Sequence, residues 1–313
     1  KQDEASEAFK DIIIKYNIIN DMTRHKLSGA GAAIPTPFTP DGRVDYPALA
    51  RTIDYIIDGG VDFIVALGTT AETPTLYLHE RAVVAMFIKN HIAGRVPLVI
   101  GVGGNSTSEV LDQLREFDLR GADAILSVTP YYNKCTQEGL VRHFGTIADA
   151  TSLPILLYNV PSRTGVNMLP ETLEKLLVKK NIVGVKEASG NMEQIEKCIA
   201  VAQDKAVVSG DDALTVATVA LGGQGVISVA SNVCPSYVSK MTHCALQGDF
   251  DKAREMQLRL LPFISALFCE VNPIPAKYAM SALGFCSAAM RLPLTEMTNN
   301  NAARLKIMLS DFV

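Results

Sequence analysis

The stretch FIVALGTTAETPTLYLHERAVVAMFIKNHIAGRVPLVIGV, residues 63–102, indicates the fold of this chain. It opens with the apolar run Phe63–Gly68 and closes with a second run, Val96–Val102. Short runs of this kind that are rich in β-branched residues are typical of buried strands. The segment Leu78–His91 between them has the apolar spacing of a helix. The stretch therefore predicts a strand, a helix and a second strand.

The same unit recurs along most of the chain. Strands followed by helices imply right-handed crossovers and a parallel sheet, and the apolar flanks of the runs suit a sheet that is covered on both faces. Eight runs are expected to form strands: Gly31–Phe38, Phe63–Gly68, Val96–Val102, Ala124–Thr129, Ile155–Val160, Ile182–Val185, Ala206–Ser209 and Gly225–Val229.

Eight units over about 225 residues fit an α/β fold of the (β/α)8 TIM-barrel type, whose usual length is roughly 250 residues. An open doubly wound sheet usually carries G-x-G-x-x-G after its first strand, and no such motif follows the first run here. After residue 250 the strand-like runs stop, and the remaining segments have helical patterns. We therefore expect an N-terminal extension over residues 1–21, a barrel over 22–250 and a helical C-terminal domain over 251–313.

Composition excludes several classes of protein. The formal net charge is −4, with 29 Lys+Arg and 33 Asp+Glu, and no basic stripe is present, so nucleic acid is not expected as a partner. No run approaches the ~20 apolar residues of a membrane span. The 6 cysteines are scattered and the 5 histidines isolated, which favours free thiols, a cytoplasmic location and no metal or other cofactor. Residues 1–21 resemble neither a signal peptide nor a transit peptide, and we expect them to lie outside the main fold.

Lys186 ends the apolar run that starts at Ile182, and alternation of side chains predicts that Ile182, Gly184 and Lys186 share one face. In a barrel of this type the active site lies at the carboxyl ends of the strands. A lysine buried there has a depressed pKa, which makes its amine a nucleophile toward a carbonyl, and Gly184 would leave room for a ligand. The alternative is a lysine that reaches solvent or pairs with a carboxylate.

Hydroxyl groups occur at three other strand ends. Tyr158 lies one strand before Lys186, and Thr69 and Tyr132 follow two earlier strands. A phenol with a second hydroxyl in reach can relay protons during carbinolamine formation and dehydration. Each alone is more often a packing residue, but together with a lysine they indicate an active site.

Arg163 lies in the loop PSRTG, where Pro161 and Gly165 stiffen the turn. Its planar guanidinium matches a carboxylate, although a solvated arginine is the plainer interpretation. The glycine-rich strings 101–104 and 222–225 lack the Lys-Ser/Thr of a phosphate-binding loop. Asp211 and Asp212 are better explained as a helix N-cap than as a metal site.

Seven segments together resemble the dihydrodipicolinate synthase (4-hydroxy-tetrahydrodipicolinate synthase) family, which belongs to the pyruvate-dependent class I aldolases of the N-acetylneuraminate lyase type. The likeness runs from about Leu27 to the C-terminus, in the family's order and spacing. The segments are GTTAETPTL, TPYYNKCTQEGL, LYNVPSRTG, GVKEASGN, SGDD, GVISV and NPIPAKYA.

The resemblance implies an enzyme of lysine and diaminopimelate biosynthesis that condenses pyruvate with L-aspartate 4-semialdehyde and forms a homotetramer, a dimer of dimers. Its matching positions assign a role to each residue of the site. Lys186 matches the Schiff-base lysine; Tyr158, Thr69 and Tyr132 match the proton relay, with Tyr132 reaching into the neighbouring subunit's site; Thr70 matches the residue that holds the pyruvate carboxylate; Arg163 matches the arginine that receives the semialdehyde; and Ile227 matches a backbone carbonyl beside pyruvate.

Two other functions stay open at this stage. One is a different pyruvate-dependent aldolase, a sialic acid or 2-keto-3-deoxysugar lyase, although sialic acid lyases usually carry Ser-Thr where this chain has Thr69-Thr70 and lack an arginine at the position of Arg163. The other is a barrel that binds a keto acid without catalysis.

Some positions depart from the family's pattern. Ala71 replaces a usual glycine, and Cys135 stands where proline is common. At the lysine-feedback site the matching residues are Asn105, Glu109 and Tyr131, whereas Leu78 and Arg81 occupy positions that are histidines in some lysine-sensitive members. Because a cationic arginine opposes a cationic ligand, we expect weak or no inhibition by lysine.

Overall fold

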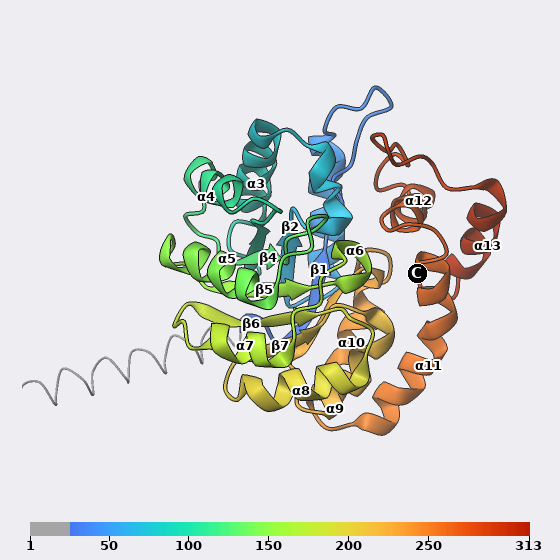
Figure 1. The fold of residues 1–313 in the computed structure, drawn as a ribbon. Coiled ribbons are helices and arrows are strands. Elements are labelled where there is room, and N and C mark those ends of the chain that lie inside the picture. Colours follow the sequence, from blue (N-terminus) through green and yellow to red (C-terminus); the bar gives the residue numbers. More distant parts are fainter. Residues whose placement is uncertain (1–25) are drawn as a thin grey trace, which may run out of the picture.

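The computed structural model describes residues 26–313, so the predicted extension over residues 1–21 lies outside the described residues. Eight parallel strands close into a barrel in chain order, which confirms the (β/α)8 fold (Figure 1). The strands are β1 Gly29–Ala33, β2 Phe63–Ala66, β3 Leu98–Gly101, β4 Ala124–Val128, β5 Ile155–Asn159, β6 Ile182–Glu187, β7 Ala206–Ser209 and β8 Gly225–Ser228.

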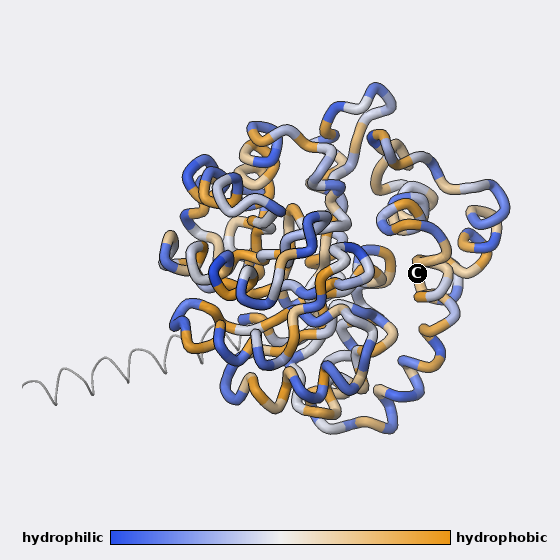
Figure 2. The backbone as a smooth tube through the Cα atoms, in the orientation of Figure 1, coloured by the Kyte–Doolittle hydropathy of each residue, from blue (hydrophilic) through white to orange (hydrophobic). Residues whose placement is uncertain are grey.

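Helices follow the strands and surround the barrel. Figure 2 shows hydrophobic and hydrophilic residues alternating along outer helices such as α8, which is the pattern of a helix with one buried face. The helices around the barrel are α2 Tyr46–Asp58, α3 Leu78–Ile92, α4 Thr107–Glu116, α5 Gln137–Asp149, α7 Pro170–Leu177, α8 Met192–Ala202, α9 Thr215–Ala220 and α10 Pro235–Leu246.

Short helical turns at the strand ends and three C-terminal helices complete the described chain. The turns are η1 Thr69–Ala71, η2 Thr73–Thr75, α6 Pro161–Thr164, η3 Asp212–Leu214 and η4 Ala230–Asn232. The C-terminal helices are α11 Phe250–Leu267, α12 Ile274–Ala282 and α13 Asn299–Leu309, coloured orange to red in Figure 1.

The first strand differs from its predicted bounds. It was expected over Gly31–Phe38, but β1 spans Gly29–Ala33 and ends before Pro35 and Pro37. Proline has no N–H for a sheet ladder, so two prolines end the strand although the apolar character continues.

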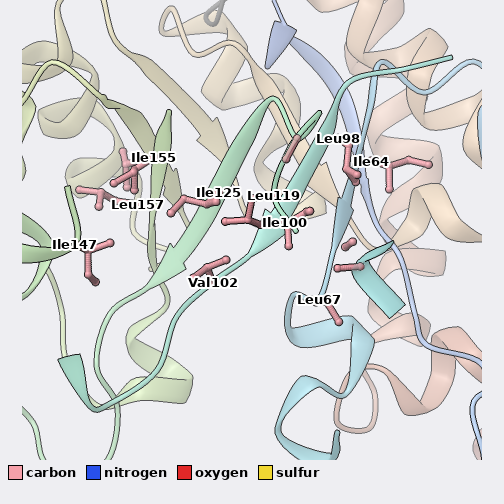
Figure 3. Close-up of a cluster of buried hydrophobic side chains, with 14 of the residues drawn as sticks. Ile64, Leu67, Leu98, Ile100, Val102, Leu119, Ile125, Ile147, Ile155 and Leu157 are labelled. Carbon is pink, nitrogen blue, oxygen red and sulfur yellow. The ribbon is translucent and has the colours of Figure 1, made fainter. Parts of the chain in front are cut away.

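Apolar side chains fill the barrel on both sides of its wall. Outward-facing strand residues such as Ile100, Ile125 and Leu157 pack in one buried cluster with helix residues such as Ile147 (Figure 3). A separate inner cluster contains Leu126, Leu156, Tyr158, Val208 and Ile227. The wall is therefore buried on both faces, as the apolar runs indicated.

A bulge in β6 changes which residues face inward. Consecutive residues of β5 pair with Ile182 and Gly184, so Val183 is an extra residue. Ile182 belongs to the outer cluster, whereas Lys186 pairs with the inward-facing Tyr158. The prediction that Ile182 shares a face with Lys186 is therefore wrong, because the bulge shifts the alternation by one residue.

The C-terminal helices share a core with the barrel. Phe263 of α11 and Leu305 of α13 belong to the same buried cluster as Val226 of β8 and Val238 of α10. This apolar core is continuous across residue 250. The division there into a barrel and a C-terminal domain therefore stays a proposal.

A buried ion pair joins α12 to the loop after β2. The side chains of Lys277 and Glu72 are both 0% exposed, and their Nζ and Oε1 atoms lie 2.6 Å apart. Lys277 also donates to the carbonyl oxygen of Ala289 at 2.7 Å. Burial lowers the pKa of Lys277, and the neighbouring Glu72 carboxylate opposes that shift. A second pair joins Arg291, which follows α12, to Glu80 of α3.

Replacing Lys277 by methionine leaves the Glu72 carboxylate buried without its cation. We expect Lys277→Met to lower the free energy of unfolding by about 3–5 kcal/mol. The double variant Lys277→Met/Glu72→Gln should recover most of that loss, because it removes both charges. Urea denaturation measures both effects. As a control, Lys252→Met, which breaks a surface pair with Glu255, should leave stability unchanged; an equal loss in both variants would contradict this account.

Candidate active site

A cavity of about 400 Å³ lies at the carboxyl ends of the strands. Residues from β5, β6 and the turns after β2 and β5 line it, including Lys186, Tyr158, Thr69, Thr70 and Arg163. These five residues were all singled out from the sequence, and they come from segments up to about a hundred positions apart. Closure of a parallel barrel brings them together, because every strand ends at the same mouth.

Lys186 and Tyr158 form the centre of the cavity. They are directly opposite each other on β6 and β5, and each is 6% exposed. The Nζ atom of Lys186 lies 4.4 Å from the centroid of the Tyr158 ring. A buried amine next to a phenol, open to a cavity of small-molecule size, is suited to attack a carbonyl.

The residue next to Lys186 faces the opposite way. Glu187 is buried on the outer side of the wall, where it accepts hydrogen bonds from Asn159 Nδ2 at 2.9 Å, Gln194 Nε2 at 3.1 Å and the Ser189 amide at 2.7 Å. Its carboxylate is therefore satisfied away from the cavity, and it does not pair with Lys186.

Two glycines near Lys186 have different roles. A Cβ on Gly184 would lie 2.0 Å from the carbonyl oxygen of Ala206, and Gly184 does not line the cavity. This glycine allows β6 to approach β7, which is a packing reason rather than the expected room for a ligand. A Cβ on Gly210 would lie 3.0 Å from Cε of Lys186, so Gly210 is the glycine that makes room for the lysine side chain.

The turn η1 carries two threonines into the cavity. Thr70 is buried, and its Oγ1 atom accepts a hydrogen bond from Asn272 Nδ2 at 3.1 Å. Ala71, where the family's pattern has glycine, lies within η1, and the left-handed backbone in this turn falls on Glu72 instead, with φ 53°. The turn thus accepts a Cβ at position 71.

Arg163 lies on α6, which Pro161 begins and Gly165 ends with a left-handed φ of 72°. Its backbone is thereby fixed, while its side chain is exposed at the rim of the cavity. The Nη2 atom donates to the carbonyl oxygen of Asn272 at 3.4 Å. A guanidinium in this position can meet the carboxylate of a substrate that enters from solvent.

Asp212 holds the end of β8. Its carboxylate accepts hydrogen bonds from the Ser228 hydroxyl and from the Val229 amide, the latter at 3.0 Å, and burial raises its pKa. Asp211, in contrast, caps η3 by accepting from the Ala213 amide, so the predicted N-cap holds for Asp211 and is wrong for Asp212. Ile227 is buried in the inner cluster just before these contacts, although it does not line the cavity.

Tyr132 does not reach the cavity of its own chain. Its side chain is 85% exposed, on a loop where both Tyr132 and Lys134 have positive φ angles. Its predicted role in the site of a neighbouring subunit stays a prediction.

A second cavity of about 360 Å³ adjoins the first and shares Thr69, Tyr158 and Arg163 with it. Tyr131 and Arg81 line it, whereas Asn105, Glu109 and Leu78 do not. Burial lowers the pKa of Arg81, and the nearby Tyr131 and Glu109 oppose that shift. Weak inhibition by lysine stays a prediction, and the half-buried arginine is its physical reason.

The C-terminal part contributes residues that the sequence analysis did not assign to the site. Ile264, Ser265 and Phe268 from the end of α11, and Asn272 from the connection to α12, line the first cavity. The only signal for Asn272 was its place in the segment NPIPAKYA, which gave no direction for its side chain.

Within residues 26–313, no group of three or more His, Cys, Asp or Glu side chains could hold a metal ion. Over the same residues, no helix is both long and apolar enough to cross a membrane.

Comparisons with known proteins agree with this geometry. The model of the dihydrodipicolinate synthetase family matches residues 26–311. A 4-hydroxy-tetrahydrodipicolinate synthase of Alkaliphilus oremlandii is 46% identical over 278 residues, which are 88% of this chain and 96% of the relative. One of Geobacter sulfurreducens is 45% identical over 91% of this chain and 98% of its own. The crystal structure of dihydrodipicolinate synthase from Aquifex aeolicus has a TM-score of 0.89 and 43% identity, covering 91% of this chain and 98% of the other. With its barrel, its buried strand-end lysine and these relatives, the chain belongs to the dihydrodipicolinate synthetase family.

Proposed function

We propose that this protein is a 4-hydroxy-tetrahydrodipicolinate synthase, which condenses pyruvate with L-aspartate 4-semialdehyde in lysine and diaminopimelate biosynthesis. The observation that carries this proposal is the buried Nζ of Lys186 beside the Tyr158 ring, in a cavity that also exposes two threonines and an arginine.

The amine of Lys186 attacks the carbonyl carbon of pyruvate and forms a carbinolamine, which loses water to give an imine. The positive imine nitrogen acidifies the methyl group, and loss of a methyl proton gives an enamine. The enamine carbon then bonds to the aldehyde carbon of the semialdehyde. The amino group of that substrate displaces the lysine as the ring closes, so the free amine is restored. Tyr158 and Thr69 move the protons of these steps.

The two carboxylates of the substrates are assigned to different groups. The hydroxyl of the buried Thr70 donates to the pyruvate carboxylate. The family's pattern assigns the backbone carbonyl of Ile227 a place beside pyruvate, although this residue does not line the cavity. Arg163 lies at the rim, where a bidentate guanidinium receives the carboxylate of the semialdehyde. Separate sites for the two anions let pyruvate bind first and leave the rim for the second substrate.

Tyr132 completes the proton relay of a second copy of the chain, in a homotetramer built as a dimer of dimers. What supports this is that its side chain is exposed and does not line the cavity of its own chain. A large aromatic side chain at such exposure is typical of a residue that anchors an interface.

Borohydride reduction in the presence of pyruvate should leave a stable adduct on Lys186. We expect Lys186→Ala to show no adduct and no condensation, because no other lysine among residues 26–313 lines this cavity. Peptide mass spectrometry locates the adduct, and Lys175→Ala, which removes an exposed lysine of α7, is the matched control. Absence of an adduct in the unaltered protein would favour a keto-acid-binding barrel without catalysis.

Removal of the rim guanidinium should affect the second substrate alone. We expect Arg163→Ala to raise KM for L-aspartate 4-semialdehyde by about tenfold or more, the usual effect of a lost charged hydrogen bond. The pyruvate adduct should form as before. Arg163→Lys keeps the positive charge but loses the planar guanidinium, so its KM for the semialdehyde should lie between those of the unaltered protein and Arg163→Ala. Equal loss of adduct and condensation, or cleavage of sialic acid by the unaltered protein, would favour another aldolase.

Two inactive variants should restore each other if Tyr132 acts across an interface. Tyr132→Phe keeps Lys186, and Lys186→Ala keeps Tyr132, so a mixed assembly contains one complete site. We expect condensation to return when the two variants are dissociated, mixed and reassembled, and not when either is reassembled alone. Failure of the mixture to regain activity, with mixed assemblies present by native mass spectrometry, would place Tyr132 outside the site.

A further inference from the structure

Asn272 connects the C-terminal part of the chain to the substrate cavity. It lies between α11 and α12, is 5% exposed and lines both cavities at the mouth of the barrel. It therefore reaches the site from outside the strand-end turns that supply Thr70 and Arg163.

Both of those substrate-binding residues are hydrogen-bonded to Asn272. Its side-chain Nδ2 donates to Thr70 Oγ1 at 3.1 Å, and its main-chain oxygen accepts from Arg163 Nη2 at 3.4 Å. The residue thus touches the group assigned to pyruvate and the group assigned to the semialdehyde.

The direction of the first hydrogen bond determines what Thr70 can do. A hydroxyl group has one proton and two acceptor lone pairs, whereas an amide nitrogen only donates. When Asn272 occupies a lone pair of Thr70, the hydroxyl proton stays free for another acceptor. Under the proposed function, that acceptor is the carboxylate of pyruvate.

The geometry does not suit a purely structural asparagine. The Oδ1 atom of Asn272 is buried and has no hydrogen-bond partner among residues 26–313. Burying an unsatisfied carbonyl oxygen costs free energy, so an apolar residue of similar size would stabilise the connection better. The single side-chain bond that the residue does make is the one to Thr70.

We propose that Asn272 is a positioning residue for the reaction, which holds the Thr70 hydroxyl as a donor to the carboxylate of pyruvate while its main chain retains Arg163 at the rim. This inference rests on the proposed function and adds the residue through which the C-terminal part acts on substrate binding.

The decisive comparison is between Asn272→Asp and Asn272→Ala. Aspartate has the shape of asparagine, but its carboxylate only accepts hydrogen bonds. The Thr70 hydroxyl would then donate to this new carboxylate in place of pyruvate, and the variant adds a negative charge near the pyruvate carboxylate. Alanine only removes the donor. We expect KM for pyruvate to rise roughly tenfold in the alanine variant and further in the aspartate variant, with the semialdehyde KM much less affected because the main-chain oxygen is kept. The pyruvate concentration for half-maximal borohydride trapping on Lys186 should rise in parallel.

A merely structural role gives the opposite order, since the isosteric aspartate would then be milder than alanine. That order, or unchanged pyruvate KM in the aspartate variant, would overturn the proposal even if the alanine variant failed to fold. Asn300→Asp, on an exposed residue of α13, is the matched control and should leave KM within about twofold.

A double-variant cycle tests whether Asn272 acts through Thr70. In a Thr70→Val background, where no hydroxyl remains to orient, Asn272→Ala should add less than about a twofold further rise in pyruvate KM. Full additivity of the two effects would contradict the proposal. If the unaltered protein traps no pyruvate, the proposed function itself fails; if it traps pyruvate and the Asn272 variants keep its KM, only this inference fails.

Discussion

The register of β6 against β5 determines which of two adjacent ionisable residues enters the barrel. Side chains alternate along a strand, so a slip of one residue exchanges its two faces. The structure sets Lys186 opposite Tyr158 on the inner face and Glu187 opposite Asn159 on the outer face. The bulge at Val183 sets which residues of β6 face inward after it. In the slipped register the carboxylate would occupy the cavity, and the lysine would be buried among the amides that now satisfy Glu187.

The loops at the mouth are held from the C-terminal side. The buried Lys277 pairs with Glu72, which directly follows η1, and Asn272 bonds to Thr70 within it. Because an unpaired charge in this interior is costly, docking of α12 and the conformation of η1 are coupled. The barrel supplies the reacting groups, and the C-terminal helices fix the turn that presents the threonines.

The sequence predicted the residues of the site that lie directly at strand ends. Lys186, Tyr158, Thr69 and Arg163 could be brought to one cavity by a single rule, because all parallel strands of a closed barrel end at the same mouth. Two other predictions failed because of local irregularities: the bulge in β6 put Ile182 on the outer face against the expected alternation, and prolines ended β1 early.

The sequence alone determined the alternation of strands and helices, because a parallel sheet buried on both faces requires continuous apolar runs. It also determined which residue types stand at the strand ends, among them the amine that carbonyl chemistry requires. Only the tertiary structure decided which distant residues meet and which side chains stay outside the cavity. Asn272 contacts Thr70 across about two hundred positions, Lys277 pairs with Glu72 over a similar separation, and Tyr132 is exposed outside the cavity of its own chain. These placements depend on how helices dock against loops, and no local pattern encodes a contact between side chains so distant along the chain.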